Sequence, residues 1–104
     1  MELHATFETE RGSQYLQTLC KHFGRKVSVR FDANVGVIEL PFGQCELKAS
    51  ATRLELSISA DCQSDLERAA QVISNHLDRY AFRENPELTW QLAAEAAAAE
   101  QTAI

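Results

Sequence analysis

The stretch "VSVRFDANVGVIELPFGQCELKASATRLELSIS", residues 27–59, decides the fold, because apolar and polar residues alternate along it in four short runs. This period of two is typical of strands that bury one face. The runs are joined by the short, turn-forming segments "DAN", "PFG" and "SAT", so we expect four successive antiparallel strands. The side chains expected to face the core are Val27, Val29, Phe31, Ile38, Leu40, Cys45, Leu47, Ala49, Leu54, Leu56 and Ile58.

A segment with helical periodicity precedes this stretch. Its apolar residues fall on a single stripe, which consists of Tyr15, Leu16, Leu19, Cys20 and Phe23. Ser13 is expected to cap the start of the helix with its side-chain oxygen. Gly24 is expected to end the helix in the left-handed conformation, from which the chain could turn directly into the first of the four strands.

A second helical segment follows the four strands. Ser64 and Glu67 have the spacing of a capping box, so we expect the helix to begin at this point. The pattern continues to about Phe82, and Pro86 then disfavours helical geometry in the residue before it. The expected core stripe of this helix is Leu66, Ala69, Ala70, Ile73, Leu77 and Tyr80.

The ends of the chain complete the predicted architecture. The segment "LHATFE", residues 3–8, alternates like a strand, and "LTW", residues 88–90, could add a short one. Residues 1–90 are therefore expected to form a single α+β domain, in the order strand, helix, four strands, helix, with both helices on one face of a curved antiparallel sheet. By its order of elements this fold resembles the TATA-binding-protein-like architecture. Residues 91–104 are expected to be an alanine-rich tail, helical or partly disordered.

Composition excludes several classes of function. The chain has 104 residues and a formal net charge of -5, which disfavours binding to nucleic acid. No run approaches the ~20 apolar residues that cross a bilayer, and an odd number of cysteines gives no disulfide framework. We therefore expect a cytoplasmic protein without a membrane partner. Since metal-ligand spacings, nucleophile motifs and phosphate-binding glycine motifs are absent from the sequence, neither a cofactor nor a metal is predicted.

The three cysteines are expected to be structural. Cys20 and Cys45 fall on apolar stripes and should be buried. Cys62 precedes the second helix and is the one thiol expected to be exposed.

Basic residues at the two helix ends are the strongest candidate for a site. If the helix ends lie side by side, these residues form a corner that accepts anions. Alternatively, the charges complement the helix dipoles and pair with Asp78 and Glu84. The candidate ligand-binding residues are His22, Arg25, Lys26, His76, Arg79 and Arg83.

Three motifs and a tripeptide carry a resemblance to a known family. The motifs "YLQTLCKHFGRKV", "IELPFGQCEL" and "HLDRYAFRE", followed by "LTW", are similar to the bacterial family catalogued as domain of unknown function 2218, from about Leu3 to Trp90. Related domains are sometimes found with siderophore-interacting proteins, so the resemblance implies a link to iron uptake and names no catalytic residue. The matching signature residues here are His22, Phe23, Gly24, Lys26, His76, Leu77, Arg79, Ala81, Phe82, Arg83 and Glu84.

Three functions remain open from the sequence. The first is a non-catalytic accessory domain that binds an anionic small molecule, or a protein partner in iron handling, at the helix ends. The second is a small enzyme in which His22 or His76 acts as a general base. The third is a homodimeric interaction module that uses the polar sheet face or the tail. A pocket with converging histidines would favour the enzyme, and a shallow basic surface would favour binding.

Overall fold

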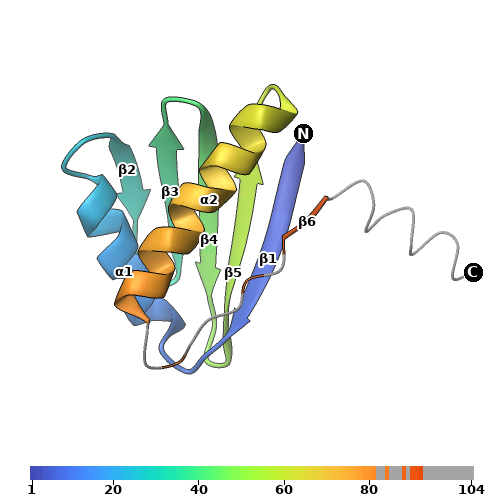
Figure 1. The fold of residues 1–104 in the computed structure, drawn as a ribbon. Helices are drawn as coiled ribbons and strands as arrows, with labels where there is room; N and C mark the ends of the chain where they lie inside the picture. The colour runs from blue at the N-terminus through green and yellow to red at the C-terminus, as the bar shows by residue number, and fades with distance from the viewer. Residues whose placement is uncertain (82–83, 85–87, 89, 93–104) are drawn as a thin grey trace, which may run out of the picture.

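Two helices and a sheet make up the computed structural model, which describes residues 1–81, 84, 88 and 90–92. Figure 1 shows the helices crossing one face of the sheet. The strands lie in the order β2-β3-β4-β5-β1-β6, and every neighbouring pair is antiparallel. In chain order the elements are β1 (Glu2–Glu8), α1 (Gly12–Phe23), β2 (Ser28–Phe31), β3 (Val35–Leu40), β4 (Gly43–Ala49), β5 (Arg53–Ser59), α2 (Gln63–Tyr80) and β6 (Gln91–Leu92).

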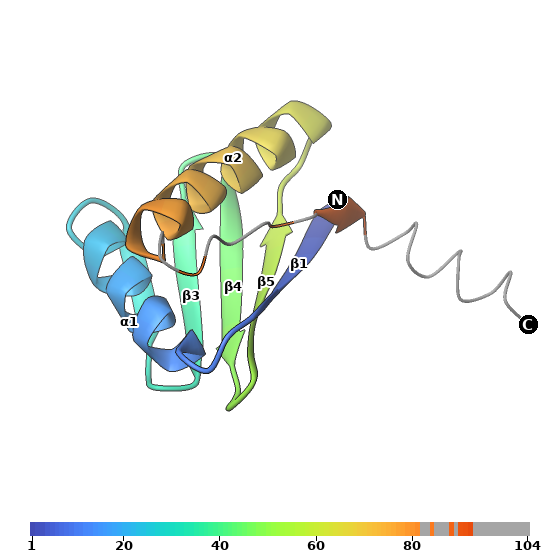
Figure 2. The ribbon, with the colours of Figure 1, turned by 60° about the horizontal axis from the view of Figure 1, so that its bottom comes forward.

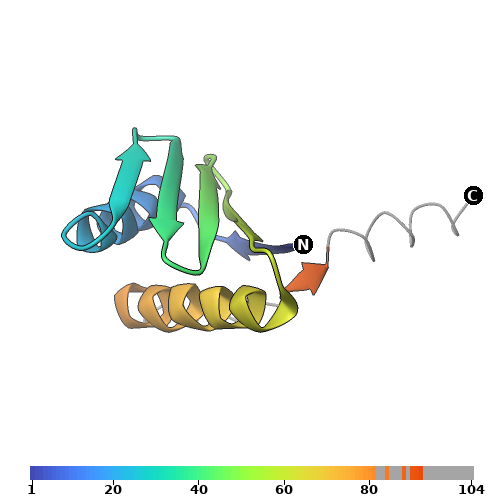
Figure 3. The same cartoon turned by 90° about the horizontal axis from the view of Figure 1, so that it is seen from above.

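The predicted two-layer α+β fold is confirmed. Strands β2 to β5 form the expected series of hairpins, and β5 pairs with β1 at the start of the chain (Figure 2). In this pairing Glu2 lies opposite Ser59. Helix α1 packs on strands β2 to β5, and α2 packs on β4, β5 and β1. Figure 3 shows α2 as a layer of its own, which runs along the lower side of the strands in that view. Neither helix is long and apolar enough to cross a membrane.

The core lies between the helices and the sheet. Cys20 and Cys45 are fully buried and Cys62 is exposed, as predicted for all three thiols. Burial raises the pKa of Cys20 to about 11, and it also raises the pKa of Cys45. The largest fully buried side chains are Leu16, Leu19, Ile38, Leu47, Leu54, Leu56, Ile58, Leu66, Ile73 and Leu77, together with the two cysteines.

A glycine on β3 allows α1 to approach the sheet closely. A methyl group added at Gly36 would lie 2.8 Å from Cys20 Sγ and 3.3 Å from a Leu16 methyl carbon. Side chains at this spacing overlap, so only a residue without Cβ permits this packing. Gly36 thus sets how closely α1 lies against β3.

The helix ends differ from the predictions. Gly24 has φ −61° and ψ −14°, so the predicted left-handed conformation is wrong. The chain instead makes a further turn, in which the amide nitrogens of Lys26 and Val27 donate to the Phe23 carbonyl oxygen at 3.0 Å and 2.9 Å. Gly24 itself therefore stays in the right-handed region, and this turn does not require a positive φ at Gly24.

Neither predicted helix cap forms. Helix α1 begins at Gly12, and the Ser13 hydroxyl accepts a hydrogen bond from Gln17 Nε2 at 3.0 Å. Helix α2 begins at Gln63, one residue before Ser64, so Ser64 lies inside the first turn. Glu67 accepts a hydrogen bond from Gln63 Nε2 at 3.2 Å, which replaces the predicted capping contact.

The two edges of the sheet also differ from expectation. Phe31 was predicted to face the core but is 40% exposed, because β2 is an edge strand with a neighbour on one side alone. The predicted strand at residues 88–90 forms instead at Gln91–Leu92, as β6 paired with β1. The sheet therefore includes two residues of the predicted tail, and residues 93–104 lie outside the described residues.

Candidate functional site

The C-terminal ends of the two helices lie together. The ring of His22, in the last turn of α1, has its centroid 4.8 Å from that of His76, in α2, and the ring planes are inclined by 45°. Tyr80 lies 5.9 Å from His22, and the buried Phe23 lies 4.8 Å from His76, again between ring centroids. Figures 2 and 3 both show the last turns of α1 and α2 on the same side of the molecule. The two helix ends therefore lie side by side, which was the condition for the predicted corner.

Positive charges surround this histidine pair. Burial lowers the pKa of His22 below its ordinary value of 6.5, and the charges of His76, Arg25, Arg79 and Lys26 lower this pKa further. Each of the three Arg and Lys side chains is exposed. We call the group formed by His22, Arg25, Lys26, His76 and Arg79 the helix-end corner. The sixth predicted residue, Arg83, lies outside the described residues.

The alternative explanation for these charges required partners. Among the residues that the structure describes, the one side-chain ion pair joins His4 Nε2 to Glu2 Oε2 at 3.7 Å. Arg79 therefore has no ion pair with Asp78 there, and Glu84 is bonded elsewhere. Within the described residues, Arg25, Lys26 and Arg79 thus have no ion-pair partner, and their interaction with the helix dipoles does not depend on one.

One ring nitrogen of the corner has a defined hydrogen. His76 Nδ1 lies 2.7 Å from the carbonyl oxygen of Val72, one turn earlier in α2. Because a carbonyl oxygen can accept but cannot donate, Nδ1 carries the hydrogen. In the neutral ring the lone pair is then on Nε2. His76 is therefore held in the form that can accept a proton or bind a metal through Nε2.

A second polar cluster, at the start of α1, was not predicted. The carboxylate of Glu84 accepts hydrogen bonds from the hydroxyl groups of Thr9, at 2.7 Å, and of Tyr15. Thr9 is buried, and its hydroxyl oxygen also accepts the backbone amide of Arg11 at 3.0 Å. Glu84 is far from Thr9 and Tyr15 in the sequence, and the sole sequence signal was the place of Glu84 in a family motif.

The hydrogen bonds of this cluster shift the pKa values of Glu84 and Tyr15 in opposite directions. Those from Tyr15 and Thr9 lower the pKa of Glu84, and the charge of Arg11 contributes in the same direction. Burial raises the pKa of Tyr15, and the bond to Glu84 raises it further. The Thr9–Tyr15–Glu84 cluster is thus internally satisfied, and it ties the chain after α2 to the start of α1.

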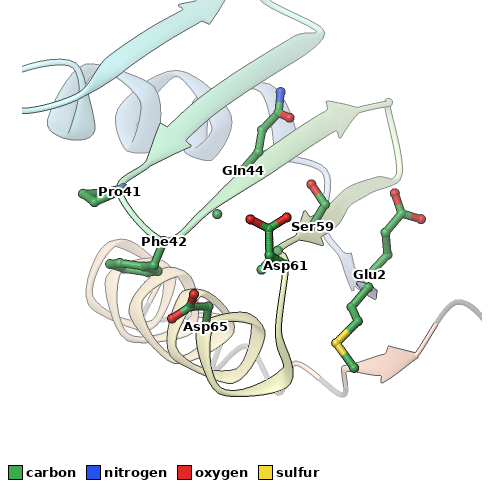
Figure 4. Close-up of a pocket in the computed structure, with 10 residues that line it drawn as sticks. Glu2, Pro41, Phe42, Gln44, Ser59, Asp61 and Asp65 are labelled. Atoms are coloured by element: carbon green, nitrogen blue, oxygen red, sulfur yellow. The ribbon is translucent and has the colours of Figure 1, made fainter.

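A depression at the opposite end of α2 is acidic. It has a volume of about 810 Å³ and is bordered by the β3–β4 turn, the end of β5 and the start of α2 (Figure 4). Glu2, Asp61 and Asp65 contribute three carboxylates to its lining, so its charge repels anions. Three other surface depressions are also lined by residues outside the helix-end corner. Within the described ranges, no three His, Cys, Asp or Glu side chains gather as a metal site.

Comparisons with known proteins agree with the predicted resemblance. The family model described as "Uncharacterized protein conserved in bacteria (DUF2218)" matches residues 4–91. A search of curated proteins found no match. The solved structure described as "NMR structure of PA4090 from Pseudomonas aeruginosa" is 29% identical, with a TM-score of 0.76 over 88% of this chain and 96% of that chain. The match over most of the sequence shows that the chain belongs to the DUF2218 family of bacterial proteins.

Proposed function

We propose that the chain is a non-catalytic accessory domain that binds an anionic small ligand at the helix-end corner. The observation that carries the proposal is the gathering of Arg25, Lys26 and Arg79 around His22 without an ion pair among the described residues. Guanidinium and ammonium groups bind carboxylates and phosphates through charge-assisted hydrogen bonds. An exposed group of such side chains therefore favours a small anion, even though the whole chain is acidic.

The biological setting is also a proposal. The resemblance of the motifs implied an association with siderophore-interacting proteins, so we place the domain in cytoplasmic iron handling, with a siderophore-derived anion or a protein partner bound at this corner. A homo-oligomer is compatible with this function. Because Arg25, Lys26 and Arg79 are exposed, a ligand bound by them would keep part of its own surface accessible to a protein partner.

An enzyme that uses His22 is the second candidate. The lowered pKa of His22 keeps its ring largely neutral at pH 7, and the neutral ring is the form that a general base needs. Catalytic bases commonly lie in a pocket that shields the reacting atoms from water. The four depressions described above are lined by other residues, so none of these four supplies such a pocket at His22.

The test is a titration of ¹⁵N-labelled protein with citrate, with inorganic phosphate and with a ferric tris-catecholate complex. The ferric complex is an anion whose iron has no open coordination position, so its binding reports charge recognition alone. We expect resonance shifts at His22 and His76 that weaken as salt rises, since screening extends over about 10 Å at 0.1 M. Tighter binding of the ferric complex than of citrate would support the assignment to iron handling.

The matched variants remove two positive charges each. Arg25→Gln with Arg79→Gln should abolish the shifts, whereas Lys48→Gln with Arg53→Gln should retain them. Lys48 and Arg53 are exposed and alternate with the buried Leu47 and Leu54, so they lie on the face of the sheet away from the helices. Equal binding by both double variants would contradict the proposal, as would the lack of any shift in the unmodified protein.

A further inference from the structure

We propose that the chain associates with a second copy of itself through the free edge of β2, so that the two six-stranded sheets join edge to edge. The proposal does not rest on the anion of the helix-end corner. It rests on three features of the β2–β3 hairpin, namely its outward-facing backbone groups, its charges and its exposed phenyl ring. Each of these features finds a complement in an antiparallel copy of the same edge.

The backbone of β2 has hydrogen-bonding groups that face the free edge. β2 is the last strand on its side of the sheet and pairs with β3 (Figure 1). The Asp32 amide donates to the Val35 carbonyl oxygen at 2.8 Å, so these two residues form a hydrogen-bonded pair. Such pairs alternate with non-hydrogen-bonded pairs along an antiparallel ladder. Val29 and Phe31 therefore direct their amide and carbonyl groups outward, and such a row is a template for a further strand.

A two-fold axis fixes how two of these edges pair. The interface of a symmetric dimer is the same patch on both copies, so the residue at the axis pairs with its own counterpart. Val29 is the middle residue of the outward-facing series, with Val27 before it and Phe31 after it. In the dimer, Val29 exchanges both backbone hydrogen bonds with Val29 of the second copy. Each Phe31 amide donates to the Val27 carbonyl oxygen of the other copy.

The charges of the outer face favour this register over its neighbours. An axis at Ser28 sets Arg30 against Lys26, and an axis at Arg30 sets two guanidinium groups against each other. Like charges directly opposite one another are destabilising. With the axis at Val29, Arg30 lies opposite the small Ser28, which is itself opposite Glu39 in β3. The guanidinium group then extends over Ser28 to the carboxylate of Glu39, and neither group has an ion pair among the described residues.

The same register covers an exposed apolar side chain. Phe31 is 40% exposed, although it has the parity of the core-facing residues of its strand. In the dimer it lies opposite Val27, a partly buried residue that packs against the core. An aromatic and a branched side chain facing each other across two strands make a favourable pair. Association therefore removes apolar surface of both copies from water.

The edge is ordered but short. Asp32 Oδ1 accepts the backbone amides of Asn34 and Val35, each at 2.8 Å, which holds the β2–β3 turn in one conformation. An edge that is already ordered loses little entropy on association. Because β2 has four residues, its contact is smaller than the about 800 Å² per partner of a standard interface. We therefore expect a weak dimer that forms at high protein concentration.

The first experiment is sedimentation equilibrium of the full chain from about 10 μM to about 1 mM, the range in which weak complexes form. We expect the average mass to rise toward twice that of the chain. Amide hydrogen exchange at Val29 and Phe31 should slow in proportion to the dimer fraction, because these amides face water in the single chain.

The second experiment swaps the charges that define the register. Arg30→Glu and Glu39→Arg should each remain monomeric, because each homodimer then sets like charges against each other at both contacts. An equimolar mixture of the two variants should regain the dimer, since both contacts then join opposite charges. Lys48→Glu and Glu55→Arg are the controls with matched changes in net charge. Both should associate like the unmodified chain, because they lie on β4 and β5, away from the edge.

The outcomes decide the proposal. A chain that stays monomeric at about 1 mM overturns it and leaves the edge to an extended segment of another protein. A dimer that persists in both charge-swap variants also overturns it, because another surface then holds the copies together. Loss of the dimer in both variants without a gain in their mixture overturns it as well. Melting temperatures of the variants, compared with the unmodified chain, separate a lost contact from a lost fold.

Discussion

The two ends of helix α1 carry polar clusters of opposite character. At its start, the hydroxyl groups of Thr9 and Tyr15 each donate a hydrogen bond to Glu84, so that both oxygens of its carboxylate are occupied. At its end, His22 faces His76 amid positive side chains that have no ion pair among the described residues. The first cluster is closed, because its groups satisfy each other. The second is open, because its charged side chains have no ion pair among the described residues.

Under the proposed function, this difference separates a structural role from a binding role on the same helix. A polar group bonded inside the protein contributes to stability, and its loss leaves a partner unsatisfied. A group that meets water can be removed with little effect on folding. Variants of the closed cluster should therefore change stability, whereas variants of the open cluster should change binding.

The largest expected effect tests whether both clusters depend on the same core. Leu77 follows His76 in α2 and is fully buried. Leu77→Ala should lower the free energy of unfolding by about 2–5 kcal/mol, because it leaves a cavity under the helix. Urea denaturation measures this loss. An unchanged midpoint would show that α2 is not anchored through this side chain.

The next effect compares the two clusters directly. Tyr15→Phe should cost about 1 kcal/mol of stability, since it removes a hydrogen bond to a charged group, and the exposure of Glu84 keeps the loss at the lower end. His22→Gln at the other end of α1 should change the urea midpoint much less at pH 8. Equal losses from both substitutions would remove the distinction between closed and open clusters.

A third prediction separates the clusters by pH. The folded pKa of Glu84 lies below its ordinary value of 4.5, so its contribution is present above pH 4.5 and is lost as pH falls through the folded pKa. The folded pKa of His22 lies below 6.5, so the unfolded chain binds the proton first. Stability due to His22 is then full above pH 6.5 and falls as the pH drops below it. Glu84→Gln should weaken the pH dependence of the melting temperature below pH 4.5, and His22→Gln should weaken it just below pH 6.5. Melting curves recorded from pH 3 to pH 8 measure both effects.

The smallest effect on stability is expected from charge removal at the open cluster. Arg25→Gln with Arg79→Gln should change stability by no more than about 0.5 kcal/mol. The same variant should raise the pKa of His22, because burial is the main cause of its shift but both guanidinium charges add to it. An NMR titration of the His22 ring measures this rise. A pKa that stays constant would place both charges too far away to meet a shared ligand.

The sequence predicts the layers of this fold better than its ends. Strict alternation in residues 27–59 and the helical stripes leave one consistent way to bury the apolar side chains, and the described core follows it. Helix caps are less predictable, because several neighbouring residues can satisfy the same amides. The start of α2 one residue before Ser64 is enough to remove the predicted capping contact. Gly24 fails as a signal of a left-handed helix end for a similar reason, because a hydrogen-bonded turn onto the Phe23 carbonyl oxygen ends the helix while Gly24 stays right-handed.

The two clusters differ in how far the sequence predicts them. The helix-end corner was expected because charges at helix ends are recognisable and α1 and α2 were both placed on one face. Its geometry still depended on how the helices meet, which brings His22 and His76 together across the chain. The contacts from Glu84 to Thr9 and Tyr15 span 75 and 69 positions, and no local pattern marks them. Such contacts follow from the path of the chain after α2, which composition does not encode.

The pairing of β1 with β5 has a consequence for how the chain is made. Residues 2–8 leave the ribosome before their partners at residues 53–59, which must still be synthesised at that point. At ~5–20 residues per second the interval is roughly 3–10 s, during which the inner face of β1, with Leu3, Ala5 and Phe7, has no sheet to join. The hairpins from β2 to β5 close locally and can form as they emerge. We expect the polar residues that alternate along β1 to limit association of the nascent chain during this interval, because they break up its apolar surface.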